Sequence, residues 1–163
     1  MSCTTFLRQE TNETGSTLTT TMDLSKKETI KDIHFGDMDV HFDRDSKTFS
    51  LSKTDKLTNS SKVDVYFESL TKSITDKQKQ TYQLIKGNFD ELLDRAYHYL
   101  IDIKKYLREN ARNEFRIESI TVFNKGDKPT ENWTLDLINL KDGFSHIIIE
   151  FYETTPIDFE VRA

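Results

Sequence analysis

The sequence predicts an α+β protein in which an antiparallel β-sheet carries two central helices, about 75–86 and 89–108, packed on one face. Three observations predict this class. Apolar and polar residues alternate up to about residue 70, a helical spacing replaces the alternation from 75 onward, and the alternation returns after residue 115. The chain has 163 residues and no fixed internal repeat, which favours a single domain over 29–163.

Residues 1–28 differ from the rest of the chain because they hold eight Thr and three Ser but few apolar residues. Threonine favours extended structure and turns over helix. Two interpretations stay open for this segment. It forms either a flexible arm or an edge strand at Thr17–Met22, in which Leu18 and Met22 pack inward.

Alternating segments before residue 70 predict a β-meander. The first two are 32–35 and 38–42, and the next is 48–52, after a turn at 43–46 whose Asp and Ser side chains bond the nearby backbone. The polar stretch 54–61 predicts a loop, and 62–68 alternates again, with its Val and Phe residues on one face.

Two helices follow, and they meet at Gly87 and Asn88. Ser73 or Thr75 is the expected cap of the first helix, Gly87 fits a left-handed stop, and Asn88 with Glu91 fits a capping box for the second. The second helix has the strongest apolar pattern in the chain, with spacings of three or four residues that require an apolar surface beneath it. Its stripe consists of Phe89, Leu93, Ala96, Leu100, Ile103 and Leu107.

Strands resume after the helices. Alternation at 116–123, 133–138, 146–152 and 157–161 is interrupted by loops rich in Gly, Asp and Pro. The segment 146–152 is the most apolar of the four, and we expect it to lie centrally in the sheet.

Composition excludes several classes of function. The chain has 23 basic and 28 acidic residues, a net charge of −5 and a pI near 5.4, which argues against a nucleic-acid partner. No apolar run approaches the roughly 18 residues of a membrane span, and the start lacks an apolar signal region. One Cys excludes a disulfide framework. We therefore expect a cytoplasmic protein that has no membrane segment.

No local catalytic, metal-binding or phosphate-binding motif is present in the sequence. We expect no catalytic residues, no bound metal and no cofactor. An acidic alternation at 37–45 is the most informative polar pattern, because period 2 places its side chains on one face of a strand. It allows three interpretations: a solvated face, a surface for a basic partner, or a divalent metal site. The candidate partner-binding residues are Asp37, Asp39, His41, Asp43, Asp45, Glu150, Tyr152 and Glu153.

The β-meander, the two helices, the Trp133-Thr-Leu-Asp-Leu segment and the closing Ile-Ile-Ile-Glu-Phe strand resemble bacterial immunity proteins of contact-dependent growth inhibition and other polymorphic toxin systems. The resemblance covers about 30–161, rests on architecture and composition, and assigns no residue roles. It implies a non-catalytic inhibitor that neutralises a cognate toxin, such as a basic nuclease, in a stoichiometric complex through an acidic face.

Two other classes of function remain. One is a small enzyme with a pocket between helix and sheet that uses His41 or His98 as a base. The other is a structural or regulatory oligomer, and the sequence leaves the oligomeric state open.

Overall fold

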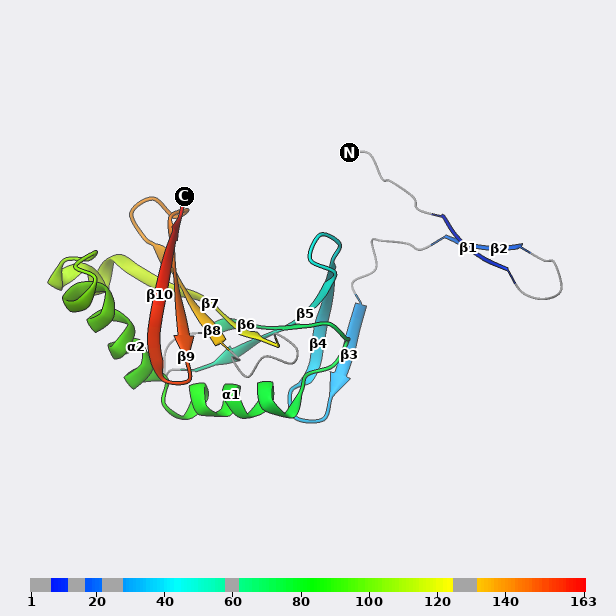
Figure 1. Ribbon diagram of the computed structural model, residues 1–163, viewed down its shortest axis with the longest axis horizontal. Coiled ribbons are helices and arrows are strands. Elements are labelled where there is room, and N and C mark those ends of the chain that lie inside the picture. The colour runs from blue at the N-terminus through cyan, green and yellow to red at the C-terminus, as the bar shows by residue number, and fades with distance from the viewer. Residues whose placement is uncertain (1–6, 12–16, 22–27, 58–61, 125–131) are drawn as a thin grey trace.

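A computed structural model describes residues 7–11, 17–21, 28–57, 62–124 and 132–163. Its centre is an eight-stranded mixed sheet with the order β10-β9-β8-β7-β6-β5-β4-β3 (Figure 1). The strands are β3 (Glu28–Asp32), β4 (Gly36–Asp43), β5 (Thr48–Lys56), β6 (Lys62–Ser69), β7 (Phe115–Phe123), β8 (Asn132–Asn139), β9 (His146–Tyr152) and β10 (Thr155–Arg162).

The prediction of an antiparallel sheet with two central helices packed on one face is wrong, because β6 and β7 run parallel. The chain leaves β6 and returns to β7 through a helical connection, and a long connection of this kind delivers the next strand in the same direction. It contains α1 (Asp76–Gly87), α2 (Phe89–His98), the π-helical turn η1 (Tyr99–Ile103) and the 3₁₀ segment η2 (Glu109–Glu114).

The two α-helices also take different places relative to the sheet. Figure 1 shows α1 below the central strands, whereas α2 runs beside β9 and β10 at one end. Arg95 of α2 donates to the Thr154 carbonyl at 3.2 Å, and the Tyr99 hydroxyl donates to the Ile157 carbonyl at 2.8 Å. The predicted helix 89–108 therefore ends as an α-helix at His98, and a wider turn continues it to Ile103.

The helix junction forms by other contacts than those expected. Asn88 makes no side-chain cap for α2, and its Nδ2 instead donates to the Leu84 carbonyl of α1 at 2.9 Å. Glu91 pairs with Arg95 at 2.6 Å. Gly87 is the last residue of α1 and does not have a positive φ.

A capping box starts α1 and also joins the two parallel strands. Thr75 Oγ1 accepts from the Gln78 N–H at 3.2 Å, and Gln78 Oε1 accepts from the Thr75 N–H at 3.0 Å. The same Gln78 side chain is fully buried, and its Nε2 donates to the carbonyls of Glu68 at 2.9 Å and Val122 at 3.1 Å. One amide therefore caps the helix and bridges β6 to β7.

Alternate residues of the strands form the core against the helices. Trp133 is fully buried and stacks on Phe151 with ring centroids 4.1 Å apart, and its Nε1 donates to the Glu153 carbonyl at 2.8 Å. Helix residues such as Tyr82, Ile85 and Leu100 belong to the same buried cluster. The helices therefore cover this face of the sheet, and no described helix covers the opposite face.

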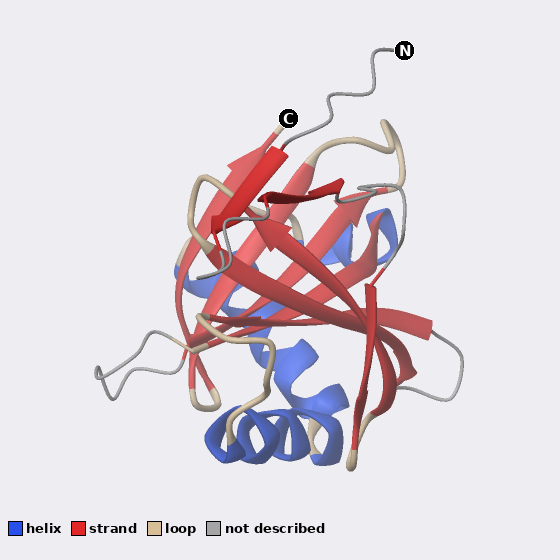
Figure 2. Ribbon diagram, turned by 90° about the vertical axis from the view of Figure 1, so that its right-hand side faces the viewer, coloured by secondary structure: helices blue, strands red, loops and turns tan. Residues whose placement is uncertain are grey.

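The sheet is strongly curved. In Figure 1 the outer strands rise on both sides of β6 and β7, with α1 under the convex side, and Figure 2 shows helices below the twisted strands. No described helix covers the concave face, which is open in this part of the chain.

The N-terminal part contributes a separate two-stranded sheet, in which β1 (Leu7–Thr11) pairs antiparallel with β2 (Thr17–Thr21). Met22 of the expected edge strand lies outside the described residues. The division into an arm at 1–28 and one domain at 29–163 stays a prediction. Within the described ranges, no helix has the length and apolar character needed to cross a membrane.

Candidate functional site

One row of register partners crosses almost the whole open face of the sheet. Register pairs in neighbouring strands share a face, so the row follows directly from the strand pairing. It consists of Asp39, Ser52, Tyr66, Thr121, Thr134, Glu150 and Asp158. An acidic residue thus stands near each end of the row, with hydroxyl groups between them.

The sequence-predicted residues on β4 all lie on this open face. Asp37, Asp39, His41 and Asp43 alternate with Met38, which is 1 % exposed on the core side. Asp45 follows in the β4–β5 turn, where its backbone N–H donates to Asp43 Oδ1 at 2.9 Å.

The predicted residues at the other end form a second group. Glu150 lies on the open face of β9, Tyr152 lies on the same face two residues later, and Glu153 is in the following turn with a φ of 52°. β4 and β9 are separated by four strands, which is about 24 Å along the sheet. The structure therefore places the predicted residues on one side of the sheet but not in one cluster.

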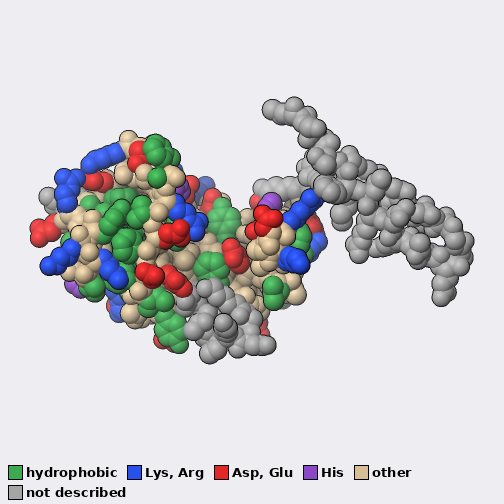
Figure 3. All heavy atoms as spheres, turned by 45° about the horizontal axis from the view of Figure 1, so that its top comes forward, with side chains coloured by type: hydrophobic (Ala, Val, Ile, Leu, Met, Phe, Trp, Pro, Cys, Tyr) green, Lys and Arg blue, Asp and Glu red, His purple; other side chains and the backbone are tan. Residues whose placement is uncertain are grey.

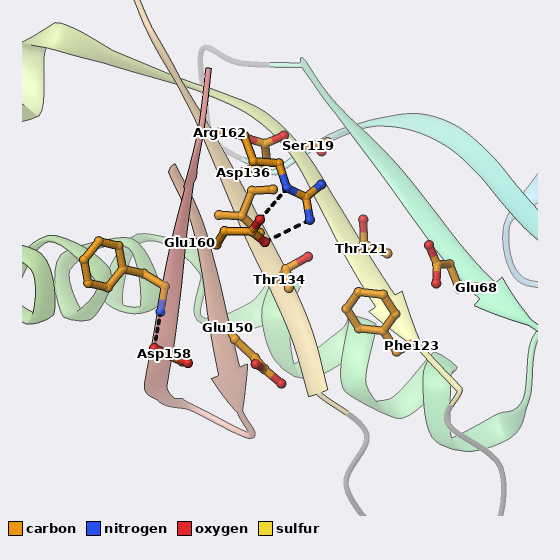
Figure 4. Close-up of a pocket in the computed structure, with 12 residues that line it drawn as sticks. Glu68, Ser119, Thr121, Phe123, Thr134, Asp136, Glu150, Asp158, Glu160 and Arg162 are labelled. Atoms are coloured by element: carbon orange, nitrogen blue, oxygen red, sulfur yellow. Dashed lines mark hydrogen bonds and ion pairs between the residues drawn. The ribbon is translucent and has the colours of Figure 1, made fainter. Parts of the chain in front are cut away.

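Between β6 and β10 the open face is hollowed into a trough of about 430 Å³. Figure 4 shows its side chains above the strands, and Figure 3 shows acidic side chains gathered along the hollow. In the described part of the chain, five carboxylates and one guanidinium line this acidic trough, with three hydroxyls on its floor. The lining residues are Glu68, Ser119, Thr121, Phe123, Thr134, Asp136, Ile148, Glu150, Asp158, Phe159, Glu160 and Arg162.

Glu160 and Asp136 of the trough each contact a nitrogen-bearing side chain. Arg162 binds both oxygens of Glu160, at 3.0 and 2.9 Å, which lowers the pKa of Glu160 and raises that of Arg162. Asp136 contacts Nδ1 of His146 at 2.9 Å through Oδ1 and at 3.1 Å through Oδ2. Among the described lining residues, carboxylates outnumber guanidinium groups by five to one.

The middle of the row keeps a neutral phenol. Burial raises the pKa of Tyr66, and the nearby carboxylates of Asp64 and Glu118 raise it further. Tyr66 therefore offers a hydroxyl near neutral pH and adds no charge of its own. In chemical terms the open face presents carboxylate and hydroxyl oxygens, which suit cationic groups.

The residues that define the trough were missed by sequence analysis, except for Glu150. Glu68, Asp136, Asp158 and Glu160 each occupy the polar position of an alternating strand. Alternation alone would have placed each one on a polar face. The order of the strands, which brings 68, 136, 150 and 158–162 together, is absent from any local pattern.

The residues that the sequence suggested for metal binding or for catalysis lie apart from one another in the structure. No group of three or more His, Cys, Asp or Glu in the described ranges is placed to hold a metal ion. His98 lies on α2 and contacts Asp102 at 2.6 Å, whereas His41 lies on the open face of β4. The structure therefore does not bring these two imidazoles into one pocket.

Comparison of the chain with protein-family models, with curated proteins and with solved structures gave no match. The geometry of the open face is accordingly the basis of the functional proposal.

Proposed function

We propose that the protein is a non-catalytic binding module that receives a positively charged segment of a partner protein on the open face of its sheet. The observation that carries the proposal is the acidic trough, where carboxylates from β6, β8, β9 and β10 converge above a floor of hydroxyls. Lysine and arginine form charge-assisted hydrogen bonds with carboxylates. A basic segment therefore matches the trough in both charge and hydrogen bonding.

The core behind the trough supports recognition by a preformed surface. Each floor strand buries its opposite face, and Val65, Ile120 and Leu135 are fully buried there. Gln78 holds β6 to β7 beneath the floor. A surface that keeps its shape loses little conformational entropy on binding, which favours affinity.

The β4 acids extend the negative surface beyond the trough. Asp37, Asp39 and Asp43 lie on the open face at the far end of the sheet. Long-range attraction between a negative surface and a basic partner raises the association rate and weakens with salt. We assign these residues to steering the partner, and the trough residues to direct contact.

We propose further that the partner is a toxin and that this protein is its immunity-type inhibitor. The support is the resemblance in architecture and composition together with the acidic open face. A nuclease toxin needs a positively charged surface to bind nucleic acid, and such a surface complements the trough. Inhibition then follows from occlusion in a stoichiometric complex.

The test begins with the protein as bait, elution of bound proteins at high salt, and identification of a stoichiometric partner. Binding kinetics of that isolated partner are then measured with Glu150→Lys/Asp158→Lys in the trough and with Glu109→Lys in η2 as a matched control. We expect the trough variant to associate at least about tenfold more slowly at low salt, and the control to keep the wild-type rate. Equal association and dissociation rates for both variants would refute the proposal.

Asp37→Lys/Asp39→Lys tests the assignment to steering. This variant is expected to slow association while it leaves the dissociation rate unchanged, because steering acts before contact.

Inhibition of the partner's activity, measured at increasing molar ratios, shows whether complex formation neutralises it. Saturation far from a one-to-one ratio, or no inhibition, contradicts the immunity assignment.

A further inference from the structure

β10 is the edge strand beside the acidic trough, and no other described strand pairs with its outer side. Its first part is blocked, because Pro156 has no N–H and the Ile157 carbonyl accepts the Tyr99 hydroxyl at 2.8 Å. The rest of the edge runs over 158–162, where the Phe159 N–H donates to Asp158 Oδ1 at 2.9 Å. An exposed strand edge presents unpaired N–H and C=O groups that can pair with another chain.

The side chains of this stretch separate into two kinds. Asp158, Glu160 and Arg162 line the acidic trough. Phe159 is also among the trough-lining residues, but its ring packs against Tyr99 and Tyr106 on the other side, which Val161 also faces at 44 % exposure. The edge of β10 thus divides an acidic surface from an apolar one.

A second cavity lies on the apolar side of β10. It has a volume of about 380 Å³ and a mixed lining, with Tyr106, Phe115 and Val161 among its apolar residues and Arg108, Glu114 and His146 among its polar ones. Tyr106 is 47 % exposed, and its ring lies 5.0 Å from that of Phe159. The exposed Tyr106 and Val161 form an apolar part of this lining, against which an additional apolar side chain can pack.

We propose that an extended segment of the partner pairs with β10 as a further strand of the sheet, with basic side chains over the trough and apolar side chains over the Tyr106–Val161 cavity. Successive residues of a strand point to opposite faces, so a segment that alternates Lys or Arg with an apolar residue satisfies both surfaces. Main-chain hydrogen bonds supply affinity in this mode of recognition, and the side chains supply specificity. The inference rests on the proposed function, since the same partner supplies the basic residues.

The charges on β10 also explain which strands are rejected. Asp158 and Glu160 repel acidic segments and desolvate unfavourably against apolar ones. The opposite edge, β3, spans only Glu28–Asp32 and carries Thr29 and Lys31 on the open face. β10 is therefore the edge that fits a basic strand.

The experiment uses the full chain and a fluorescein-labelled peptide, acetyl-Lys-Val-Lys-Val-Lys-Val-Lys-amide, followed by fluorescence anisotropy. Two matched peptides carry N-methyl groups on all valines or on all internal lysines, which removes the donors of one peptide edge and keeps the charge. We expect at least one methylated peptide to bind about tenfold or more weakly than the parent. Val161→Ser is expected to weaken the parent peptide severalfold, whereas Leu70→Ser, at an exposed site elsewhere, is expected to leave its affinity unchanged.

Hydrogen exchange locates the bound peptide. Slowed exchange at amides within 158–162 on addition of the parent peptide supports strand pairing. Equal binding of the parent and both methylated peptides overturns the inference, and so does unchanged exchange in β10. If a basic partner still loses binding with Glu150→Lys/Asp158→Lys under those outcomes, the trough function stands and only the strand-pairing mode fails.

Discussion

At the scale of single residues, Asp55 joins the sheet to the first helix. Its Oδ2 accepts hydrogen bonds from the Tyr82 hydroxyl at 2.5 Å and from the Lys86 ammonium at 3.0 Å, and Lys53 lies 3.5 Å away. Burial raises the pKa of Asp55, but these donors and the Lys56 backbone N–H outweigh it and hold the pKa at about 2, below 3.8. Burial and Asp55 together raise the pKa of Tyr82.

This low pKa predicts a pH-dependent stability. The ionised Asp55 stabilises the fold fully above pH 3.8, and the stabilisation is lost as the pH falls towards 2. We expect Asp55→Asn to lower the free energy of unfolding at pH 7 by about 1–2 kcal/mol and to reduce its decline between pH 4 and 2. Urea denaturation across this pH range measures both effects.

Asp45→Asn is the matched control, because Asp45 lies in an exposed turn. It should keep both the wild-type stability and the wild-type pH dependence. An Asp55→Asn protein with an unchanged decline between pH 4 and 2 would contradict the role given to Asp55. The polar stretch 54–61 predicted a loop at Asp55, whereas β5 continues through Lys56 and pairs Asp55 with Val63 of β6.

At the scale of secondary-structure elements, the end of α2 separates residues that the helical pattern placed together. Leu100 and Ile103 are three residues apart and share a face in a regular helix. In the structure Leu100 is fully buried, whereas Ile103 is 61 % exposed. The π-helical turn over Tyr99–Ile103 changes the rotation per residue and turns Ile103 away from the core.

We therefore expect Leu100→Ala to lower the free energy of unfolding by about 2–5 kcal/mol, because it leaves a cavity in the core. Ile103→Ala should change it by less than about 0.5 kcal/mol, as for most exposed sites. Chemical denaturation of the two variants provides the comparison. Similar losses from both substitutions would indicate that the helix continues regularly to 103.

At the scale of the whole molecule, alternation indicated most of the strands but not their arrangement. Segments such as 62–68 and 146–152 are strands as expected, because period-2 burial is visible in the local sequence. The parallel junction of β6 and β7 depends on a helical crossover and on the buried amide of Gln78, which no periodic pattern encodes. A sheet assigned by alternation alone therefore has the right faces and an undetermined order.

For the candidate site as well, the sequence predicts the face of the sheet but not the order of the strands. Asp39 and Glu150 were chosen as polar positions on strands, and the register places them in one row. The trough instead gathers Glu68 with Asp136 and Glu160, which come from distant parts of the sequence. Strand order and curvature create this site. Local sequence patterns therefore predict which face of the sheet is polar, but they do not predict which of its residues form the trough.

Hydrogen–deuterium exchange of the full chain, alone and saturated with its isolated partner, tests the central claim most directly. The acidic trough predicts slowed exchange in β9 and β10 and over 64–68 of β6, with α1 unchanged as an internal control. Protection confined to α1 and α2, with β9 and β10 exchanging at the same rate in both states, would contradict the assignment of the open sheet face as the binding surface.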